Sequence, residues 1–475
     1  MHLSSQRTRS FYSFFQPAIA WMAIIGFAGF STLCAFAGLS KVLNLIFPIG
    51  AVAVGLLLYF RAPLLYIGFT WWLWFLSPLI RRYIDYRSIY TEPSLIILTP
   101  FLVTLITLIT VFQNIPKAKQ QESLPFILTL LGVLYGYLIG ALLTSPISAT
   151  AKVFEWLAPV TFSFHLFVNW REYPSYRQTT QRIFLWCVLI TGAYGIYQFM
   201  VAPEWDTAWM LNLEERAVTF GIPEPFGIRV WSTMHGPLVF ASVMAAGLIL
   251  LTTSTGSLSF LAIMLGFLTL LLSMVRTAWL GWLFGMFDLL VFLKPKFQMR
   301  LILFVVILAL CLIPLINLEP FSDVINSRIQ TLTDLSNDTS ASARQGAYAS
   351  QLGTALTNVL GDGIGGRFAN QVFDSAILES FFTLGLFGGA FYLGGMASLL
   401  SRLIGNFRTS TDVFLNAARA ITIAIVVQMP LGSVIRGLPG VVLWGFLGIG
   451  LAAQKYHQDQ SLQTTLPSVL TSRPK

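Results

Sequence analysis

Long apolar segments alternate with short polar links along almost the whole chain of 475 residues. A helix needs about 20 consecutive apolar residues to cross a bilayer, and fourteen segments approach that length. They are residues 18–38, 43–60, 64–79, 95–112, 125–143, 151–168, 183–201, 237–251, 258–273, 277–292, 301–315, 376–400, 417–429 and 438–452. Since the shorter ones can be re-entrant or merged, the pattern predicts an all-α polytopic membrane protein with about 12–14 transmembrane helices.

Two longer polar stretches, residues 202–231 and 317–375, interrupt this pattern. The second is too long for an idle connection, because such loops are usually functional or disordered. An apolar stripe over positions 342–360 predicts an amphipathic helix on the membrane surface within it. The expected parts are a cytoplasmic N-terminus (1–17), an N-terminal bundle (18–201), a first outer loop (202–231), central helices (232–316), a large outer loop with short helices (317–375), C-terminal helices (376–453) and a disordered cytoplasmic tail (454–475).

Basic residues in the short links predict the orientation, because Lys and Arg are enriched in cytoplasmic loops. With the N-terminus inside, the inner links carry Lys117, Lys119, Arg171, Arg177, Arg182, Lys294, Lys296, Arg300, Arg402 and Arg408, and both long polar stretches lie outside. Arg81, Arg82 and Arg87 break the rule, so either the helix count is off there or these arginines bind something anionic outside. We expect a multi-pass protein of the cytoplasmic (inner) membrane with both termini in the cytoplasm.

The composition agrees with a membrane protein and disfavours several other classes. Charged residues make up only 10% of the chain, against about 25% in soluble domains. The net charge of +9 lies mainly in links between apolar segments, which is typical of membrane orientation and not of nucleic-acid binding. The three cysteines and four histidines are too scattered for a disulfide framework or a metal site, so we expect no metal and no cofactor.

Two carboxylates, Asp374 and Glu379, stand at the start of a strongly apolar helix. Asp374 precedes the helix and can cap it by accepting a hydrogen bond from a first-turn N–H. Glu379 lies inside the helix and must face protein, water or a cation. Three arginines on the same side, Arg229, Arg276 and Arg344, suggest a cluster of arginines and carboxylates that binds a diphosphate and holds a base beside it.

These assignments have simpler alternatives. Arg344, in the first turn of the predicted surface helix, can bind a phosphate or be a solvated charge, and Arg276 can be a membrane-surface anchor. His235 and Arg367 are secondary candidates, and a histidine in an apolar setting such as that of His235 is more often structural than a base. The glycine-rich segment 360–368 lacks the strand and the Gly-Lys-Ser/Thr of a nucleotide loop, so it predicts a tight turn that passes close to a ligand or a neighbouring helix.

Taken in order, residues 229–389 resemble the bacterial O-antigen ligase and polysaccharide polymerase superfamily, the Wzy-type membrane glycosyltransferases. The matching positions are Arg229, Ser232 or Thr233, Pro237, Ser273, Arg276, Arg344, Ala355, Leu356, Gly363, Gly365, Asp374, Ser375 and Gly385. Ligases of this family have His where this chain has Asp374, as a proposed general base or acceptor-orienting residue, and many of the polymerases have Asp. The resemblance therefore points towards a polymerase.

The resemblance implies a metal-independent glycosyltransferase that polymerises undecaprenyl-diphosphate-linked oligosaccharide repeat units at the outer face of the membrane, in exopolysaccharide, O-antigen or capsule synthesis. Arg229 and Arg344, with Arg276 as a third, would bind the diphosphate. Asp374 would orient or deprotonate the acceptor, with Glu379 in support. The expected partners are the lipid-linked oligosaccharide, membrane lipid, and a chain-length regulator and a flippase of the same pathway. The alternatives are a ligase that transfers polymer to a lipid or protein acceptor, and a lipid-linked-oligosaccharide flippase.

Overall fold

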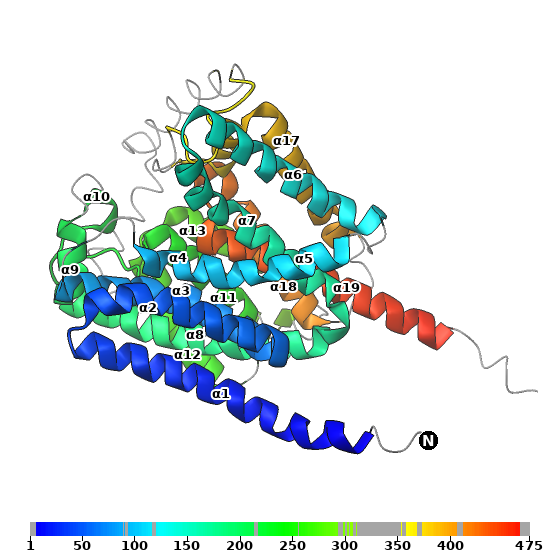
Figure 1. Ribbon diagram of the computed structural model, residues 1–475, viewed down its shortest axis with the longest axis horizontal. Coiled ribbons are helices and arrows are strands. Elements are labelled where there is room, and N and C mark those ends of the chain that lie inside the picture. Colours follow the sequence, from blue (N-terminus) through cyan, green and yellow to red (C-terminus); the bar gives the residue numbers. More distant parts are fainter. Residues whose placement is uncertain are drawn as a thin grey trace, which may run out of the picture.

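The computed structural model describes residues 6–88, 90, 94–115, 120–212, 217–254, 256–292, 358–367, 373–405 and 412–465, with a few isolated positions from 298 to 353. Over these residues the chain is a bundle of helices (Figure 1). Of the fourteen predicted transmembrane segments, thirteen are helical, and the other, residues 301–315, lies largely outside the described residues. The prediction of an all-α polytopic membrane protein is confirmed.

Within the described ranges, nine helical segments are long and apolar enough to cross a membrane. In chain order the helices are α1 (Gln6–Phe36), α2 (Ser40–Arg61), α3 (Pro63–Arg87), α4 (Leu95–Thr104), η1 (Leu105–Thr107), α5 (Leu108–Asn114), α6 (Gln120–Leu143), α7 (Pro146–Val168), η3 (Trp170–Glu172), α8 (Tyr173–Val201), α9 (Glu204–Leu211), α10 (Ala217–Phe220), α11 (Pro237–Leu251), α12 (Ser257–Leu272), α13 (Arg276–Phe292), α17 (Ala376–Gly405), α18 (Val413–Val426), η6 (Met429–Leu431) and α19 (Gly437–Thr465). Helices α11 and α12 are apolar but shorter than the nine.

The long helices run back and forth along the long axis of the molecule (Figure 1). The start of α1 and the end of α19 lie at one end of the molecule, and α9 and α10 lie at the other (Figure 1). We call the end with α9 the outer end, because it carries the polar stretch predicted to be outside. The end of α3 and the turn between α12 and α13 also lie at the outer end, since they contact the segment that contains α9 and α10.

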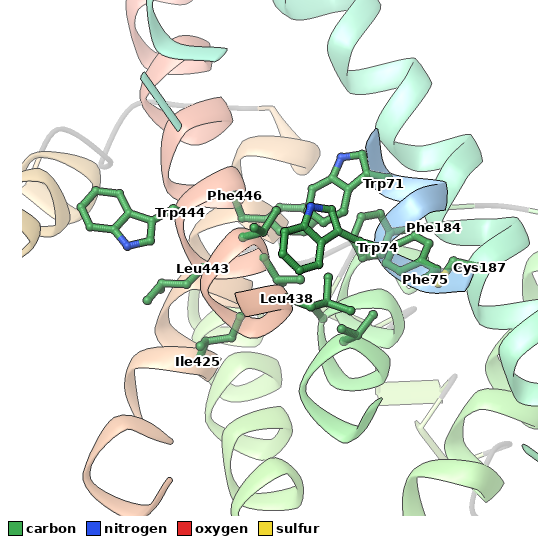
Figure 2. Close-up of a cluster of buried hydrophobic side chains, with 14 of the residues drawn as sticks. Trp71, Trp74, Phe75, Phe184, Cys187, Ile425, Leu438, Leu443, Trp444 and Phe446 are labelled. Atoms are coloured by element: carbon green, nitrogen blue, oxygen red, sulfur yellow. The ribbon is translucent and has the colours of Figure 1, made fainter. Parts of the chain in front are cut away.

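The core is built around α19. Of the apolar window in α19, 94% is buried, against 17% in α1. The labelled residues of the cluster in Figure 2 come from four helices. They are Trp71, Trp74 and Phe75 of α3, Phe184 and Cys187 of α8, Ile425 of α18, and Leu438, Leu443, Trp444 and Phe446 of α19. Large aromatic side chains dominate the burial in such a core. The indole of Trp444 donates to the Tyr392 hydroxyl of α17 at 3.1 Å. Helix α19 therefore connects α17 with α3, α8 and α18.

The prediction of a disordered tail from residue 454 is wrong for residues 454–465. Helix α19 continues to Thr465 because the inner ends of other helices hold it. Lys455 pairs with Glu122 of α6, and His457 Nε2 lies 2.9 Å from Asp412 Oδ2 at the start of α18. Residues 466–475 lie outside the described residues.

The predicted outer loop 202–231 is also more ordered than a polar link. It contains α9 and α10, and its last part packs into the bundle, where Ile228, Val230 and Trp231 are fully buried. An antiparallel bridge between Gly221 and Ile228 closes the turn before this buried part. The polar sequence signal is matched by the exposed residues 222–226, whereas residues 228, 230 and 231 behave as core.

Candidate functional site at the outer end

The start of α17 is fixed by hydrogen bonds at both sides of its first turn. The N–H of Ala376 donates to the carbonyl oxygen of Gly432 at 3.2 Å, and the Ser375 hydroxyl accepts from the N–H of Leu378 at 3.4 Å. The hydroxyl of Ser375 therefore occupies the capping position that the sequence suggested for Asp374.

Asp374 is exposed, although its backbone is anchored on both sides. On one side Ser375 caps the helix, and on the other the buried ring of Phe373 stacks on Phe382 with ring centroids 5.7 Å apart. A carboxylate on a fixed backbone at the surface is well placed to meet a substrate hydroxyl, because little conformational entropy is lost when it binds.

Glu379 is only 1% exposed and lies at the buried end of a chain of charged side chains. Its Oε1 lies 2.5 Å from Nε of Arg436, and its Oε2 accepts a hydrogen bond of 2.5 Å from the Ser433 hydroxyl. Arg436 Nη1 donates to Glu155 Oε2 at 3.0 Å, and Glu155 Oε1 accepts from Lys152 Nζ at 3.0 Å. This Glu379 network joins α17, the segment before α19, and α7.

The Glu379 network leads from the bundle interior towards the surface. The exposed fraction of the side chain is 1% for Glu379, 18% for Arg436, 22% for Glu155 and 32% for Lys152. Burial alone would lower the pKa of Arg436, but the negative charges of Glu379 and Glu155 outweigh it and raise the pKa of Arg436. Arg436 is therefore a permanent cation at the mouth of α17.

The cation that pairs with Glu379 is Arg436, and not Arg229 or Arg276 of the predicted cluster. The third arginine of that cluster, Arg344, lies outside the described residues. Sequence reasoning missed the other members of the network as well. A signal was present for two of them, since Lys152 and Glu155 are charges three residues apart inside a predicted transmembrane segment. Arg436 had no comparable signal, because it lies in a short link.

A glycine loop, residues 358–367, interrupts α17 from outside the helix. Gly385, inside α17, has φ 71° and does not follow the helical path. The loop replaces the helical bond lost there, because Phe382 O accepts from Asp362 N–H at 2.9 Å and Leu386 N–H donates to Val359 O at 3.0 Å. Non-helical backbone at membrane depth is tolerated only where protein or water satisfies its polar groups.

The glycine loop also binds α6. The N–H of Ile364 donates to the carbonyl oxygen of Gly136 at 2.8 Å, and Gly363 and Gly140 pass each other with no room for a Cβ on either. At 1.5 Å per residue, Gly136 and Gly385 lie about 10–14 Å from the outer ends of their helices. The predicted tight turn close to a neighbouring helix is confirmed, but it lies inside the bundle and not on the surface.

Asp362, at the centre of the glycine loop, is 9% exposed. Its Oδ1 accepts hydrogen bonds from Asn358 Nδ2 at 3.3 Å and from Arg367 Nη2 at 3.2 Å. Within the described part of the chain, its buried Oδ2 has no hydrogen-bond partner. Arg367, a secondary candidate, pairs with Asp362, and its own side chain is 85% exposed.

A second group of arginines lies at the end of α12. The guanidinium of Arg229 donates to the carbonyl oxygens of Ser273 at 3.4 Å and of Met274 at 3.2 Å. Arg276 begins α13 only two residues later. The structure thus brings together Arg229 and the segment "SMVRTA", the two parts of the resemblance that are 44 residues apart in the chain.

The arginines that broke the orientation rule lie at the end we call outer, and the three helices predicted before them are all present as α1, α2 and α3. Helix α3 continues to Arg87 instead of ending at residue 79. Arg82 is 2% exposed and its Nε lies 2.9 Å from Oδ1 of the fully buried Asp206 of α9. Its other nitrogens donate to the carbonyl oxygens of Ser232 at 2.5 Å and Met234 at 2.8 Å. The anion that Arg82 binds is part of the protein itself.

The remaining candidates have different outcomes. His235 is exposed, with its ring 6.0 Å from that of Trp209, so the apolar setting expected for it is wrong. Arg344 and most of the predicted surface helix over residues 342–360 lie outside the described residues. In the part of the chain that the structure describes, no group of three or more His, Cys, Asp and Glu side chains could hold a metal ion.

No protein-family model matches the chain, and no curated protein matches it. The function is therefore inferred from the chemistry of the outer end and from the residues that carry the resemblance.

Proposed function

We propose that the protein polymerises oligosaccharide repeat units carried on undecaprenyl diphosphate, as a metal-independent glycosyltransferase of the inner membrane. The observation that carries this proposal is the mouth of α17, where the exposed Asp374 follows an anchored Phe373 and precedes the buried Glu379 network. A transferase of this kind needs a base at the acceptor hydroxyl and cations at the leaving diphosphate. Both kinds of group are present at the outer end.

In the proposed reaction, the acceptor hydroxyl attacks the anomeric carbon of the lipid-linked sugar. The new glycosidic bond forms as the bond from that carbon to the diphosphate oxygen breaks, and the hydroxyl proton passes to Asp374. The negative charge that develops on the leaving diphosphate is stabilised by Arg229, Arg276 and Arg344, since a guanidinium can bind phosphate oxygens with two N–H groups. Glu379 acts as a positioning residue, because its bonds to Arg436 hold the first turn of α17.

The test uses the purified protein in detergent with undecaprenyl-diphosphate-linked repeat units, without nucleotide or added metal. We expect a ladder of longer lipid-linked chains. Asp374→Asn removes the base, and general acid–base catalysis contributes about 10²–10⁴-fold in rate, so the ladder should be lost. The matched control is Asp459→Asn, which changes a partly exposed acid near the inner end of α19 and should leave the ladder intact.

A full ladder from Asp374→Asn would remove Asp374 from the reaction. No ladder from the wild-type protein, with the substrate shown to be intact, would overturn the proposal. In cells, the site where intermediates accumulate then separates the alternatives. Loss of a flippase leaves single repeats on the lipid inside, loss of a polymerase leaves single repeats outside, and loss of a ligase leaves extended chains on the carrier.

A further inference from the structure

A cavity of about 360 Å³ opens at the outer end between α3 and α9. It is lined from the α3 side by Arg82, Asp85, Tyr86, Ser88 and Tyr90, and from the α9 side by Ala208, Trp209 and Asn212. Its volume is at the small end of the range of about 300–1,000 Å³ that is usual for ligand pockets. Of the described residues proposed above as functional, none lines it.

The lining suits a sugar ring better than a lipid chain. Among the described residues that line the cavity, Ala208 has the only aliphatic side chain, a single methyl group, so a prenyl or acyl chain would find little apolar surface on them. Tyr86, Tyr90 and Trp209 supply aromatic rings instead. One face of a pyranose carries weakly positive C–H groups that fit the negative face of an aromatic ring, and its hydroxyls need donors and acceptors such as those of Asn212.

The described arginines at the cavity, Arg81 and Arg82, already have carboxylate partners, which disfavours an anionic ligand. Arg82 is paired with Asp206, and Arg81, behind the wall, is paired with Asp85 at 3.2 Å. A diphosphate would have to compete with these carboxylates for both arginines. A neutral ligand with many hydroxyls makes no such demand, because it can add hydrogen bonds to Asp85 without displacing a counter-ion.

The aromatic wall is also held in place before any ligand arrives. The Arg81 guanidinium lies 4.6 Å from the ring centroid of Trp209 and 5.4 Å from that of Tyr90, and the two aromatic rings lie 5.7 Å apart. Such cation–π stacking fixes the ring orientations. A preorganised wall loses little side-chain entropy on binding.

We infer that this cavity is a carbohydrate subsite that takes one or two neutral sugar rings of the glycan on which the proposed polymerase acts. The inference rests on the proposed function for the identity of the glycan. The position agrees, because Trp209 of the cavity contacts His235 and Arg82 binds the carbonyl oxygens of Ser232 and Met234. These residues belong to the segment that begins with Arg229, the proposed diphosphate-binding residue.

The test measures binding separately from transfer, by saturation-transfer NMR on the purified full-length protein in detergent. The probe is the repeat-unit oligosaccharide released from the lipid carrier by mild acid, together with methyl glycosides of common neutral hexoses. Ala208→Trp fills the cavity, and we expect Kd to rise at least about tenfold, which corresponds to about 1.4 kcal/mol. Leu211→Trp adds the same side chain to an exposed position of α9 outside the cavity and should bind as the wild type does.

A second variant, Tyr90→Ala, removes one aromatic wall without filling the space, and a similar loss of binding is expected. Saturable binding that survives both Ala208→Trp and Tyr90→Ala overturns the inference, as does the lack of any saturable signal from the wild-type protein. Failure of the proposed function has a different result, namely sugar binding that depends on the cavity with no ladder in the transfer assay. If both hold, an increase of KM for the acceptor chain alone, or for the lipid-linked donor alone, in Ala208→Trp shows which glycan occupies the cavity.

Discussion

At the scale of single residues, the buried carboxylate of Glu379 makes the protein depend on Arg436. Arg436→Met leaves this carboxylate without a cation, and removing one partner of a buried pair costs about 3–5 kcal/mol. Glu379→Gln in the same chain removes the uncompensated charge, so the double variant should be more stable than Arg436→Met alone. The unfolding temperature in detergent is measured for Arg436→Met, for Glu379→Gln and for the double variant. Losses that simply add would contradict direct coupling between the two residues.

The residue that best reports pH is Asp412, just before α18. Burial would raise the pKa of Asp412, but hydrogen bonds from His457, Tyr173 and the N–H of Phe414, with the charge of Arg177, lower it from 3.8 to about 2. Because the folded pKa is below the unfolded one, Asp412 stabilises the fold above about pH 4, and this contribution is lost as the pH falls towards 2.

We expect the contribution of Asp412 to be about 1–2 kcal/mol after allowance for its partial exposure. The wild-type protein should therefore unfold at a higher temperature than Asp412→Asn at about pH 6, and the gap should narrow as the pH is lowered to about 2.5. A gap that does not change over this range would mean that Asp412 acts through hydrogen bonds made equally well by its neutral form.

At the scale of elements, the contact between the glycine loop and α6 tolerates no side chain. A Cβ on Gly140 would overlap the carbonyl oxygen of Ile364, whereas a Cβ on Gly394 of α17 would meet nothing within 4 Å. Overpacking typically costs about 1–3 kcal/mol, so Gly140→Ala should lower the unfolding temperature and Gly394→Ala should not. Equal stability of the two variants would show that the loop can leave this position without loss.

The elements also show how far the sequence could be interpreted. Hydropathy alone located thirteen segments that the structure describes as helices, nine of them long and apolar enough to cross a membrane, because the membrane demands apolar length whatever the helices contact. It misplaced the end of α3, since the charge of Arg82 is neutralised by Asp206, which lies 124 residues later in the chain. Hydropathy likewise could not place the glycine loop inside the bundle. The position of the loop depends on the helix break at Gly385 and on the glycines of α6, which let the loop approach the helix backbone.

At the scale of the whole molecule, the outer end gathers the chemistry that the sequence had spread over several segments. Two groups were predicted in part, namely Asp374 and Glu379 at α17 and Arg229 with Arg276 near α12. The connection of Glu379 through Arg436 to α7 was not predictable, because ion pairs between helices depend on how the helices pack. What the sequence did indicate is the side of the membrane on which these groups lie.

That side is itself a prediction, which labelling of single cysteines tests in intact cells. Leu211, the last residue of α9, and Leu462, near the end of α19, are 70% and 65% exposed. Helix α9 and the end of α19 lie at opposite ends of the molecule (Figure 1). In a background without native cysteines, a membrane-impermeant maleimide should label Leu211→Cys from outside, but Leu462→Cys only after the cells are opened. The reverse pattern would place the Glu379 network in the cytoplasm, where no lipid-linked glycan acceptor is expected. Labelling of both cysteines from outside would contradict the placement of the two ends on opposite sides of the membrane. It would also contradict the predicted crossing at residues 301–315, which the chain needs in order to pass from the end of α13 to the start of α17.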